Sequence, residues 1–405
     1  MSTPLGIYIS VPFCKAKCTF CNFASGAFAA DRMQSYVERV VAEIGAVRGV
    51  AERLGAEIPG EVDSIYFGGG TPSLLGPEQF REIFARLRGE FAVAVGAEVT
   101  LECAPGQLGE ATLEELLRQG MNRMSFGVQS FVDRESAAVG RLHTEQMCQE
   151  ELARVRAAGV EAVNLDLIVG LPHQTEASWR YSLDAAVASG VPHVSVYMLE
   201  VDEDSRLGKE MLAQGSRYSA GEVPSEDDAA AWYQVGCEVL GAGGLRQYEI
   251  SNFAREGSAS RHNMKYWRRQ PYIGFGLDAH SMLRTSEGAL RFANTSELDA
   301  YLAESEASGL EMFRAKTGEP EVEVIGREAA FEEALFLGLR MNDGVDLGEL
   351  RREFGDVLVR GAMAAVQETR SAGLLALEGD RLRLTDGGRM VSNEVFSRLL
   401  VSAVA

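Results

Sequence analysis

The sequence is short of positive charge, cysteine and long apolar runs, and each shortage excludes a class of protein. Its 39 Lys and Arg face 59 Asp and Glu, so general binding to nucleic acid or anionic membranes is not expected. Six cysteines in 405 residues do not form a disulfide framework, and free thiols fit a reduced cytoplasmic compartment. No apolar stretch reaches transmembrane length and no signal peptide is recognisable, so we expect no membrane span.

The chain alternates between strand-like and helix-like patterns, which is typical of parallel βα repetition. Its length and its 46% hydrophobic residues favour one large barrel with an appendage. The expected strands are residues 5–10, 64–67, 98–101, 123–126, 163–169 and 194–199. Six βα units are fewer than the eight of a closed barrel, so the sequence predicts an open, partial (β/α)6 TIM-like barrel.

Three regions are expected along the chain. Residues 1–220 would form the partial barrel, and residues 221–310 an extension that completes its core. The acidic stretch 202–228 is expected to be a long loop or lid. Residues 311–405 would form a smaller, mainly helical domain, because predicted helices there precede a hairpin in a winged-helix-like order. Acidic residues outnumber basic ones in this domain, so DNA binding is not favoured.

The unusual residues of the barrel region follow the predicted strands. A cysteine-rich loop follows the first strand, a Gly-Gly-Gly-Thr-Pro-Ser run follows the second, and Glu102 ends the third. Gly-Val-Gln-Ser follows the fourth strand, and Asp166 lies in the fifth. Ligands of parallel βα folds bind at the carboxyl ends of the strands, so these segments predict one common site.

The cysteine-rich loop contains Cys14, Cys18 and Cys21 with the spacing CxxxCxFC. Thiolates are soft ligands that suit iron–sulfur clusters and zinc. A fourth cysteine is missing, because Phe23 and Ala24 stand where the run would continue. A structural zinc site needs four closed ligands, so this alternative and that of simple buried thiols are less favoured. A cubane cluster on three cysteines would leave one iron open for another ligand.

This motif, placed after an N-terminal strand, resembles the signature of the radical S-adenosylmethionine (SAM) superfamily. The flanking run Ile-Tyr-Ile-Ser-Val-Pro-Phe-Cys at residues 7–14 resembles the branch that contains oxygen-independent coproporphyrinogen III oxidase and the HemW-type haem chaperones. The resemblance implies a [4Fe-4S] cluster on the three cysteines and SAM on the open iron. One electron would then cleave a C–S bond of SAM to give a 5′-deoxyadenosyl radical.

The resemblance also assigns a SAM site. The run at residues 68–73 matches the family motif GGGTPS, and Glu102-Cys-Ala-Pro-Gly resembles EANPG with departures at Cys103 and Ala104. Taken singly, each polar residue is equally well explained by a structural hydrogen bond. The implied SAM residues are Tyr8, Phe20, Gly69, Gly70, Thr71, Glu102, Gln129, Arg141 and Asp166.

A second motif, HNxxYW, begins at His262. Residue types alone favour a packed histidine with core aromatics. The resemblance instead implies haem binding by His262, Asn263, Tyr266 and Trp267, with an axial imidazole and aromatic cover of the porphyrin. His280 is a further candidate near the site.

Two departures from the oxidase favour a HemW-type chaperone over the enzyme. Phe23 replaces the fourth cysteine of the oxidase, and only seven residues precede Tyr8, where the oxidase carries an extension. Ser10 stands where the family usually has histidine, which weakens any acid–base role there. The predicted function is binding of haem and its transfer to an acceptor protein, which allows peripheral contact with a membrane haemoprotein.

Two alternatives stay open. One is oxidative decarboxylation of coproporphyrinogen propionates, which is not expected, and the other is a radical SAM reaction on an unrelated substrate. The sequence does not decide whether SAM is cleaved.

Overall fold

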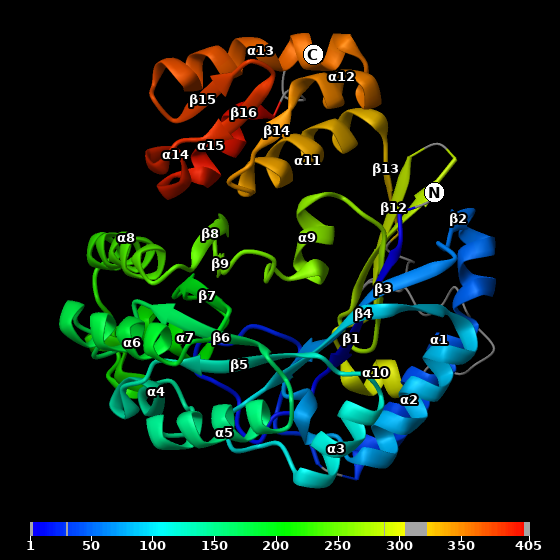
Figure 1. The fold of residues 1–405 in the computed structure, drawn as a ribbon, viewed down its shortest axis with the longest axis vertical. Helices are drawn as coiled ribbons and strands as arrows, with labels where there is room; N and C mark the ends of the chain where they lie inside the picture. Colours follow the sequence, from blue (N-terminus) through cyan, green and yellow to red (C-terminus); the bar gives the residue numbers. More distant parts are fainter. Residues whose placement is uncertain (1–2, 30, 287, 304–321, 401–405) are drawn as a thin grey trace.

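The computed structural model describes residues 3–29, 31–286, 288–303 and 322–400. Its centre is an arc of parallel strands with helices on the outside, and a smaller C-terminal domain stands above it in Figure 1. Six parallel strands follow one another in space in chain order: β1 (Leu5–Val11), β3 (Glu61–Gly69), β4 (Ala92–Cys103), β5 (Arg123–Gln129), β6 (Ala162–Val169) and β7 (His193–Met198). The predicted partial barrel and all six predicted strands are confirmed.

The strands form the core with one face of the arc, on which their side chains are apolar. In β1 every residue except Tyr8 is buried. Ile7 lies opposite Ile65 of β3, which in turn lies opposite Val99 of β4, so apolar rows run across the arc. Alternate residues point to the other face, which carries polar side chains such as Ser64 and Asp166, so the two faces of the arc differ in polarity.

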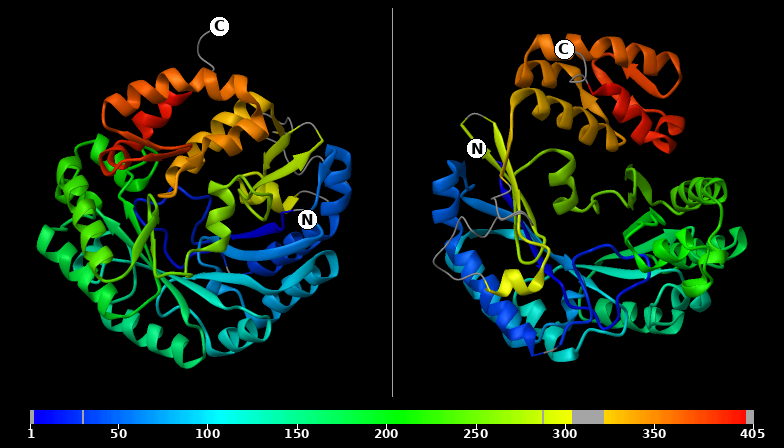
Figure 2. Two further views of the ribbon diagram at one scale, coloured as in Figure 1. Left: turned by 45° about the horizontal axis from the view of Figure 1, so that its top comes forward. Right: turned by 180° about the vertical axis from the view of Figure 1, so that it is seen from behind.

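Helices cover the outer face of the arc, as both views of Figure 2 show. They bury one apolar face each, for example Val40 and Ile44 of the first helix. The helices are α1 (Arg32–Leu54), α2 (Pro77–Glu90), α3 (Glu110–Arg118), α4 (Asp133–Ala138), α5 (Glu145–Ala157) and α6 (Glu176–Ala188).

Further strands extend both edges of the arc. At the β1 edge, β10 (Tyr272–Phe275) pairs in parallel and is followed by antiparallel β11 (His280–Thr285), β12 (Ala289–Ala293) and β13 (Val322–Ile325). The short strand β2 (Ala56–Glu57) also pairs with β11. At the β7 edge lie antiparallel β9 (Asn252–Ala254) and β8 (Arg246–Glu249). These strands occupy both edges while the arc stays open.

The expected long loop at 202–228 is partly wrong. It contains the helix α7 (Arg206–Leu212) and the 3-10 segment η2 (Arg217–Glu222), and α8 (Glu226–Ala242) begins within it. The hydroxyl of Ser205 accepts a hydrogen bond from the Gly208 amide at 2.9 Å and so caps α7. The acidic composition of the stretch indicated a loop, so Ser205 was not recognised as a capping residue.

The C-terminal domain has its own hydrophobic core, which includes Phe331, Leu350 and Leu382. The predicted hairpin is present, and a sixteen-residue helix, α13, was not predicted. The expected boundary between the regions 221–310 and 311–405 lies outside the described residues. The elements are α11 (Arg327–Arg340), β14 (Val345–Asp346), α12 (Leu347–Phe354), α13 (Asp356–Ser371), β15 (Leu375–Glu378), β16 (Arg381–Leu384), α14 (Asp386–Met390) and α15 (Ser392–Leu399).

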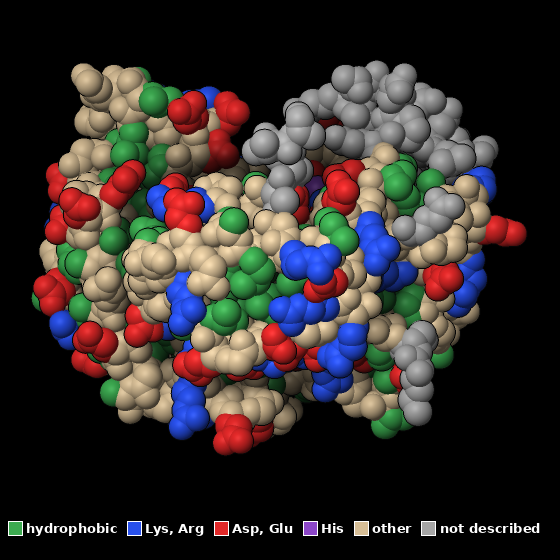
Figure 3. Space-filling model, turned by 90° about the horizontal axis from the view of Figure 1, so that it is seen from above, with side chains coloured by type: hydrophobic (Ala, Val, Ile, Leu, Met, Phe, Trp, Pro, Cys, Tyr) green, Lys and Arg blue, Asp and Glu red, His purple; other side chains and the backbone are tan. Residues whose placement is uncertain are grey.

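Charges of both signs are interspersed on the face seen from above in Figure 3. Arginines of the C-terminal domain pair with carboxylates, as Arg351 does with Asp380 at 2.8 Å. This mixture differs from the single basic face that nucleic-acid binding requires.

Within the described part of the chain, the helices are all too short or too polar to cross a bilayer.

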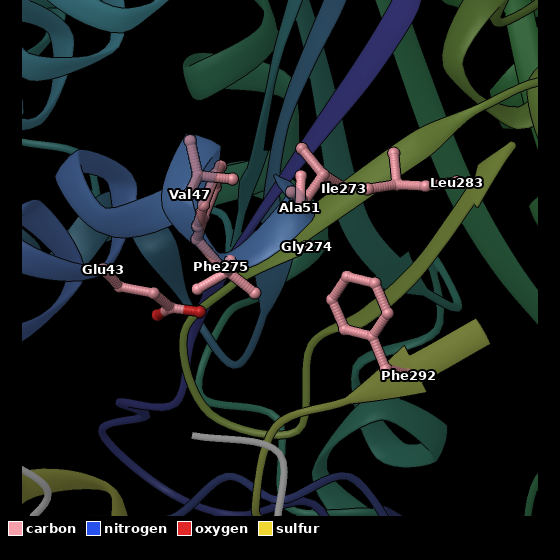
Figure 4. Close-up of a pocket in the computed structure, with 9 residues that line it drawn as sticks. Glu43, Val47, Ala51, Ile273, Gly274, Phe275, Leu283 and Phe292 are labelled. Atoms are coloured by element: carbon pink, nitrogen blue, oxygen red, sulfur yellow. The ribbon is translucent and has the colours of Figure 1, made fainter. Parts of the chain in front are cut away.

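A small void lies between α1 and the strands β10, β11 and β12. Figure 4 shows apolar side chains from the helix and from the strands facing one another, with Glu43 at one end. The void measures about 10 Å³, which is room for one water at most. It is therefore a packing feature and not a ligand site.

Candidate functional site

The three predicted cluster cysteines lie in one closed loop after β1. The Cys14 amide donates to the Gly26 carbonyl at 2.9 Å, and the Gly26 amide donates to the Pro12 carbonyl at the same distance. These bonds tie the two ends of the loop together. Buried Phe13 anchors it by packing edge-on against Tyr36, with ring centroids 5.4 Å apart.

Each of these thiols has a polar side chain beside it. The sulfur–donor distances are 3.7 Å from Cys14 to Thr71 Oγ1 and 3.6 Å from Cys18 to Arg141 Nη1. Cys21 lies 3.8 Å from Ser25 Oγ. Hydrogen bonds and a nearby cation favour thiolates, while burial raises the pKa of the Cys14 thiol. The surroundings therefore suit a thiolate-ligated group at this loop.

The glycine run at the end of β3 lies directly against the cysteine loop. The Gly70 amide donates to the Val11 carbonyl and the Thr71 amide donates to the Phe13 carbonyl, each at 2.8 Å. A Cβ on Gly70 would come within 2.8 Å of both carbonyl oxygens. Gly69 has φ of 101°, which side chains rarely adopt. Glycine is thus required for this close approach.

Arg141 and Gln129 carry buried polar atoms without a hydrogen-bond partner among the described residues. These atoms are Nε of Arg141 and Oε1 of Gln129. Gln129 has φ of 68°, a strained conformation for a residue with a side chain. Both side chains crowd Gly127, where a Cβ would lie 2.9 Å from Arg141 Nη2. Unsatisfied buried groups require an explanation, and a bound ligand supplies one.

Glu102 and Asp166 place two carboxylates on the inner side of the arc. Glu102 accepts a hydrogen bond from Tyr66 at 2.9 Å, and burial with the nearby charge of Asp166 raises its pKa to about 7. Asp166 accepts hydrogen bonds from Asn164 at 2.7 Å and Ser125 at 3.1 Å, and burial raises its pKa as well. Glu102 is therefore the less saturated of the two acceptors.

Phe20 lies on a different side of the loop. It packs against a small apolar cluster of Val139, Ile168 and Leu171. The implied role of Phe20 in SAM binding stays a prediction.

The HNxxYW motif forms the short helix α9 (Arg261–Trp267), which lies above the inner side of the arc in Figure 1. Glu98 in the middle of β4 holds its start, since one carboxylate oxygen accepts from the His262 backbone amide at 3.0 Å and the other from the Arg261 backbone amide at 3.1 Å. Lys265 is buried and pairs with Asp63 at 2.6 Å. The helix is thereby fixed to the amino-terminal part of β3 and to the middle of β4.

His262 points inward from this helix and is 1% exposed. Its Nδ1 lies 3.0 Å from Ser64 Oγ and its Nε2 lies 2.9 Å from Tyr266 Oη, so both nitrogens are engaged. Burial, with the charge of Lys265 added, lowers the pKa of His262 to about 3. The imidazole is therefore neutral at physiological pH.

The remaining motif residues face different neighbours. Trp267 packs under the guanidinium of Arg340 of the C-terminal domain, 4.4 Å from the ring centroid, and its Nε1 has no partner among the described residues. The backbone amide of Asn263 donates to the Ser260 hydroxyl at 3.3 Å. His262 and Tyr266 are in contact with each other, and Tyr266 is the one of the four predicted haem residues that borders the cavity.

An aromatic row joins the predicted SAM side to the α9 side. The rings of Tyr8 and Tyr66 stack at 6.0 Å, and Tyr66 stacks on His262 at 5.2 Å. His262 meets Tyr266 edge-on at 5.3 Å, and Tyr266 meets Tyr272 at 4.6 Å. The two predicted ligand regions are therefore contiguous.

A cavity of about 320 Å³ opens beside this row. Ligand sites commonly measure about 300–1,000 Å³, so it suits one small ligand or one edge of a macrocycle. Tyr272 and Asp278 were not singled out from the sequence, because they reach the cavity only through the pairing of β10 with β1. Its lining is Tyr8, Ser10, Phe23, Ala24, Ser25, Gly69, Tyr266, Tyr272, Leu277, Asp278 and His280.

A thiol-bearing loop at the carboxyl edge of a partial parallel barrel defines the class of radical SAM proteins. The sequence profile of the radical SAM superfamily matches residues 8–186, and that of the HemN C-terminal domain matches residues 325–391. The chain is 31% identical to the heme chaperone HemW of Mycobacterium tuberculosis, over 98% of this chain and 95% of the relative. It is 28% identical to the heme chaperone HemW of Lactococcus lactis, with 100% and 99% covered.

A mouse relative, the mitochondrial radical S-adenosyl methionine domain-containing protein 1, is 33% identical over 98% of this chain and 88% of that protein. The solved structure of Escherichia coli coproporphyrinogen III oxidase (HemN) matches with a TM-score of 0.81 and 22% identity, covering 98% of this chain and 90% of that one. The match to HemN shows the shared fold alone. The chain belongs to the HemW family of the radical SAM superfamily.

Membership in this superfamily implies a [4Fe-4S] cluster and SAM. The described residues contain no group of three His, Cys, Asp or Glu closed around a single metal ion. The three thiolates that ligate a cubane cluster each bind a different iron. The donors beside the three sulfurs and the orphaned atoms of Gln129 and Arg141 fit both groups.

Proposed function

We propose that this protein is a cytoplasmic haem chaperone that binds a [4Fe-4S] cluster and SAM and passes haem to an acceptor protein. The observation that carries the proposal is the shared cavity. Ser25 and Gly69 line it from the cluster side, while Tyr266 and Tyr272 line it from the α9 side. A group bound in this cavity would contact both regions at once.

On the cluster side, Cys14, Cys18 and Cys21 would ligate three irons of the cluster. SAM bound at the open iron supplies radical chemistry when an electron is delivered. The guanidinium of Arg141, which contacts the sulfur of Cys18, would stabilise the negative charge of the thiolate there.

Around the sulfonium cofactor, the backbone of Gly69 and Gly70 would let the ligand approach without Cβ obstruction. Glu102 and Gln129 would accept hydrogen bonds from hydroxyl or ammonium groups, because both retain acceptor capacity. Tyr8, Thr71, Asp166 and Phe20 complete the proposed SAM surroundings.

On the α9 side, Tyr266 would cover part of a porphyrin together with Tyr272. His262, Asn263 and Trp267, the other residues predicted for haem, lie on the same helix, and His262 holds the Tyr266 hydroxyl. An imidazole is the usual iron ligand in a haem site, and a histidine at the cavity is therefore central to the proposal.

The test is an anaerobic haem titration of the reconstituted protein, followed by visible absorption. The same samples receive coproporphyrinogen III, SAM and reductant. Saturable haem binding without porphyrin product, and transfer of that haem to an apo-haemoprotein, is the expected result. Formation of protoporphyrinogen would instead establish the oxidase, and failure to bind haem would refute the chaperone.

A further inference from the structure

We propose that His280, and not the histidine of the HNxxYW motif, supplies the imidazole that ligates the haem iron. The proposal rests on the haem-binding function proposed above. It concerns a residue that stands at the cavity, whereas the motif histidine lies behind the cavity wall.

His280 begins β11 and is exposed at the cavity. Within the described residues its ring takes part in no hydrogen bond, ion pair or ring contact. Both ring nitrogens are thus available to a ligand. Tyr8, Tyr266 and Tyr272 line the same cavity, so a flat macrocycle ligated by His280 would have aromatic surface beside it.

His262 is in the opposite situation. It does not line the cavity, and the hydroxyls of Ser64 and Tyr266 occupy its two nitrogens. Iron ligation through Nε2 of His262 would need to break its buried hydrogen bond to the Tyr266 hydroxyl and to move that ring. The hydrogen bond between His262 and the Tyr266 hydroxyl suits a role in positioning the Tyr266 ring.

The chain contains five histidines, and the other three are also engaged. His143 is buried and lies 3.0 Å from the Val128 carbonyl. His193 is buried between Asn164 and Tyr248. His173 lies 3.1 Å from both Arg134 Nη2 and Ser219 Oγ. None of the three lines the cavity, which leaves His280 as the histidine that does.

The turn that precedes His280 is held from behind by a buried polar network. Glu43 accepts from Asn294 at 2.6 Å, from the Gly276 amide at 3.0 Å and from Tyr301 at 2.5 Å. The Tyr36 hydroxyl accepts from the Leu277 amide at 2.8 Å and donates to the Ser10 carbonyl at 2.7 Å.

The backbone amide of Asn294 donates to the Ala279 carbonyl at 3.0 Å. The turn from Gly276 to Ala279 is therefore bonded on both sides of its bend. A ligand side chain on such a supported turn is pre-organised for binding, because its backbone does not need to be ordered. This support gives His280 a fixed origin at the cavity edge.

The experiment compares haem binding by the wild type, His280→Ala, His262→Gln and the matched control His173→Ala, all with reconstituted cluster. Visible absorption and electron paramagnetic resonance report the axial ligand directly. We expect His280→Ala to lose the imidazole signature and to bind haem more than about tenfold more weakly, since even partners outside a ligand sphere change metal affinity about 10–100-fold. His262→Gln and His173→Ala should retain the signature.

Added imidazole separates ligation from folding. It should restore the wild-type spectrum to His280→Ala, because it can occupy the space that the side chain leaves. An unchanged imidazole signature in His280→Ala would overturn the inference while leaving the proposed function intact. Loss of the signature in His262→Gln alone would also overturn it. Absence of haem binding by the wild type would refute the proposed function itself and the inference with it.

Discussion

Sequence motifs occur both in helix α9 and in the cluster rim, which is the cysteine loop after β1 with Thr71 and Arg141 beside it. The two regions differ in how the motif residues are arranged in space. At the rim, the residues predicted from separate motifs lie together, as Arg141 does with Cys18 and Thr71 with Cys14. In α9, neighbouring residues of one motif face separate parts of the molecule. His262 contacts β3 through Ser64, while Trp267 contacts the C-terminal domain.

The difference follows from the geometry of the two elements. Parallel strands bring their carboxyl ends to one edge, so residues far apart in sequence meet there. A helix directs successive side chains around its axis, and residues four apart share a face. His262 and Tyr266 accordingly touch, at 2.9 Å between Nε2 and Oη, whereas Trp267 points elsewhere. A motif on a helix therefore does not define one contact surface.

The largest effect is expected at the rim, where three thiols from one loop would hold one cluster. Cys14→Ser should abolish stable cluster assembly, because a hydroxyl is a poor substitute for a soft thiolate. Iron and sulfide content and visible absorption after anaerobic reconstitution measure this. The matched control is Cys148→Ser, since Cys148 is a buried core residue on α5. Full iron content in Cys14→Ser would show that the cluster is held elsewhere.

Much of the barrel was predictable because strand runs and their following loops are local in sequence. The order of β1 and β3 to β7 follows chain order, so predicting the strands was nearly sufficient to predict the arc. The SAM and cluster residues could be proposed from motif resemblance for the same reason. Most of them lie in a recognisable strand or in the loop that follows it, whereas Arg141 follows α4.

The α9 side was less predictable because it depends on long-range pairing. Tyr272 reaches the cavity only since β10 pairs with β1, more than 260 residues away in sequence, as Gly6 opposite Tyr272 shows. The inward turn of His262 depends on Ser64, and the outward turn of Trp267 depends on Arg340. No local pattern carries these partners.

A second prediction concerns the carboxylate inside the rim. Burial raises the pKa of Glu102 from 4.5 to about 7, so the folded state favours its protonated form. This contribution to stability is fully present below pH 4.5 and is lost as the pH rises through about 7. Glu102→Gln removes the titration. The cofactor-free wild type should therefore lose at most about 3 kcal/mol relative to the variant between these limits.

Urea unfolding at several pH values between 4 and 8 measures this difference. Glu176→Gln serves as the control, because Glu176 is exposed on α6 and its variant should follow the wild-type pH profile. Equal pH dependence in the wild type and Glu102→Gln would show that Glu102 ionises normally. The site would then offer SAM a more polar environment than the structure indicates.

The smallest effect is expected where α9 meets the C-terminal domain. Arg340→Lys keeps the charge that pairs with buried Glu249 but loses the planar stack over Trp267. We expect the free energy of unfolding to fall by about 0.5–1 kcal/mol. A double-mutant cycle with Trp267→Phe measures the coupling. The matched control is Arg360→Lys, because the Arg360 side chain is exposed on α13.

The same variants sharpen the contrast between the two motifs. Because Trp267 stacks on Arg340 and does not line the cavity, Arg340→Lys and Trp267→Phe should leave haem affinity within about twofold of the wild type. Tyr266→Ala should weaken it more, since Tyr266 does line the cavity. If Trp267→Phe instead weakens haem binding as much as Tyr266→Ala, the two rings share one ligand. The helix would then have to rotate on binding, and the contact between Trp267 and Arg340 would be the one that opens.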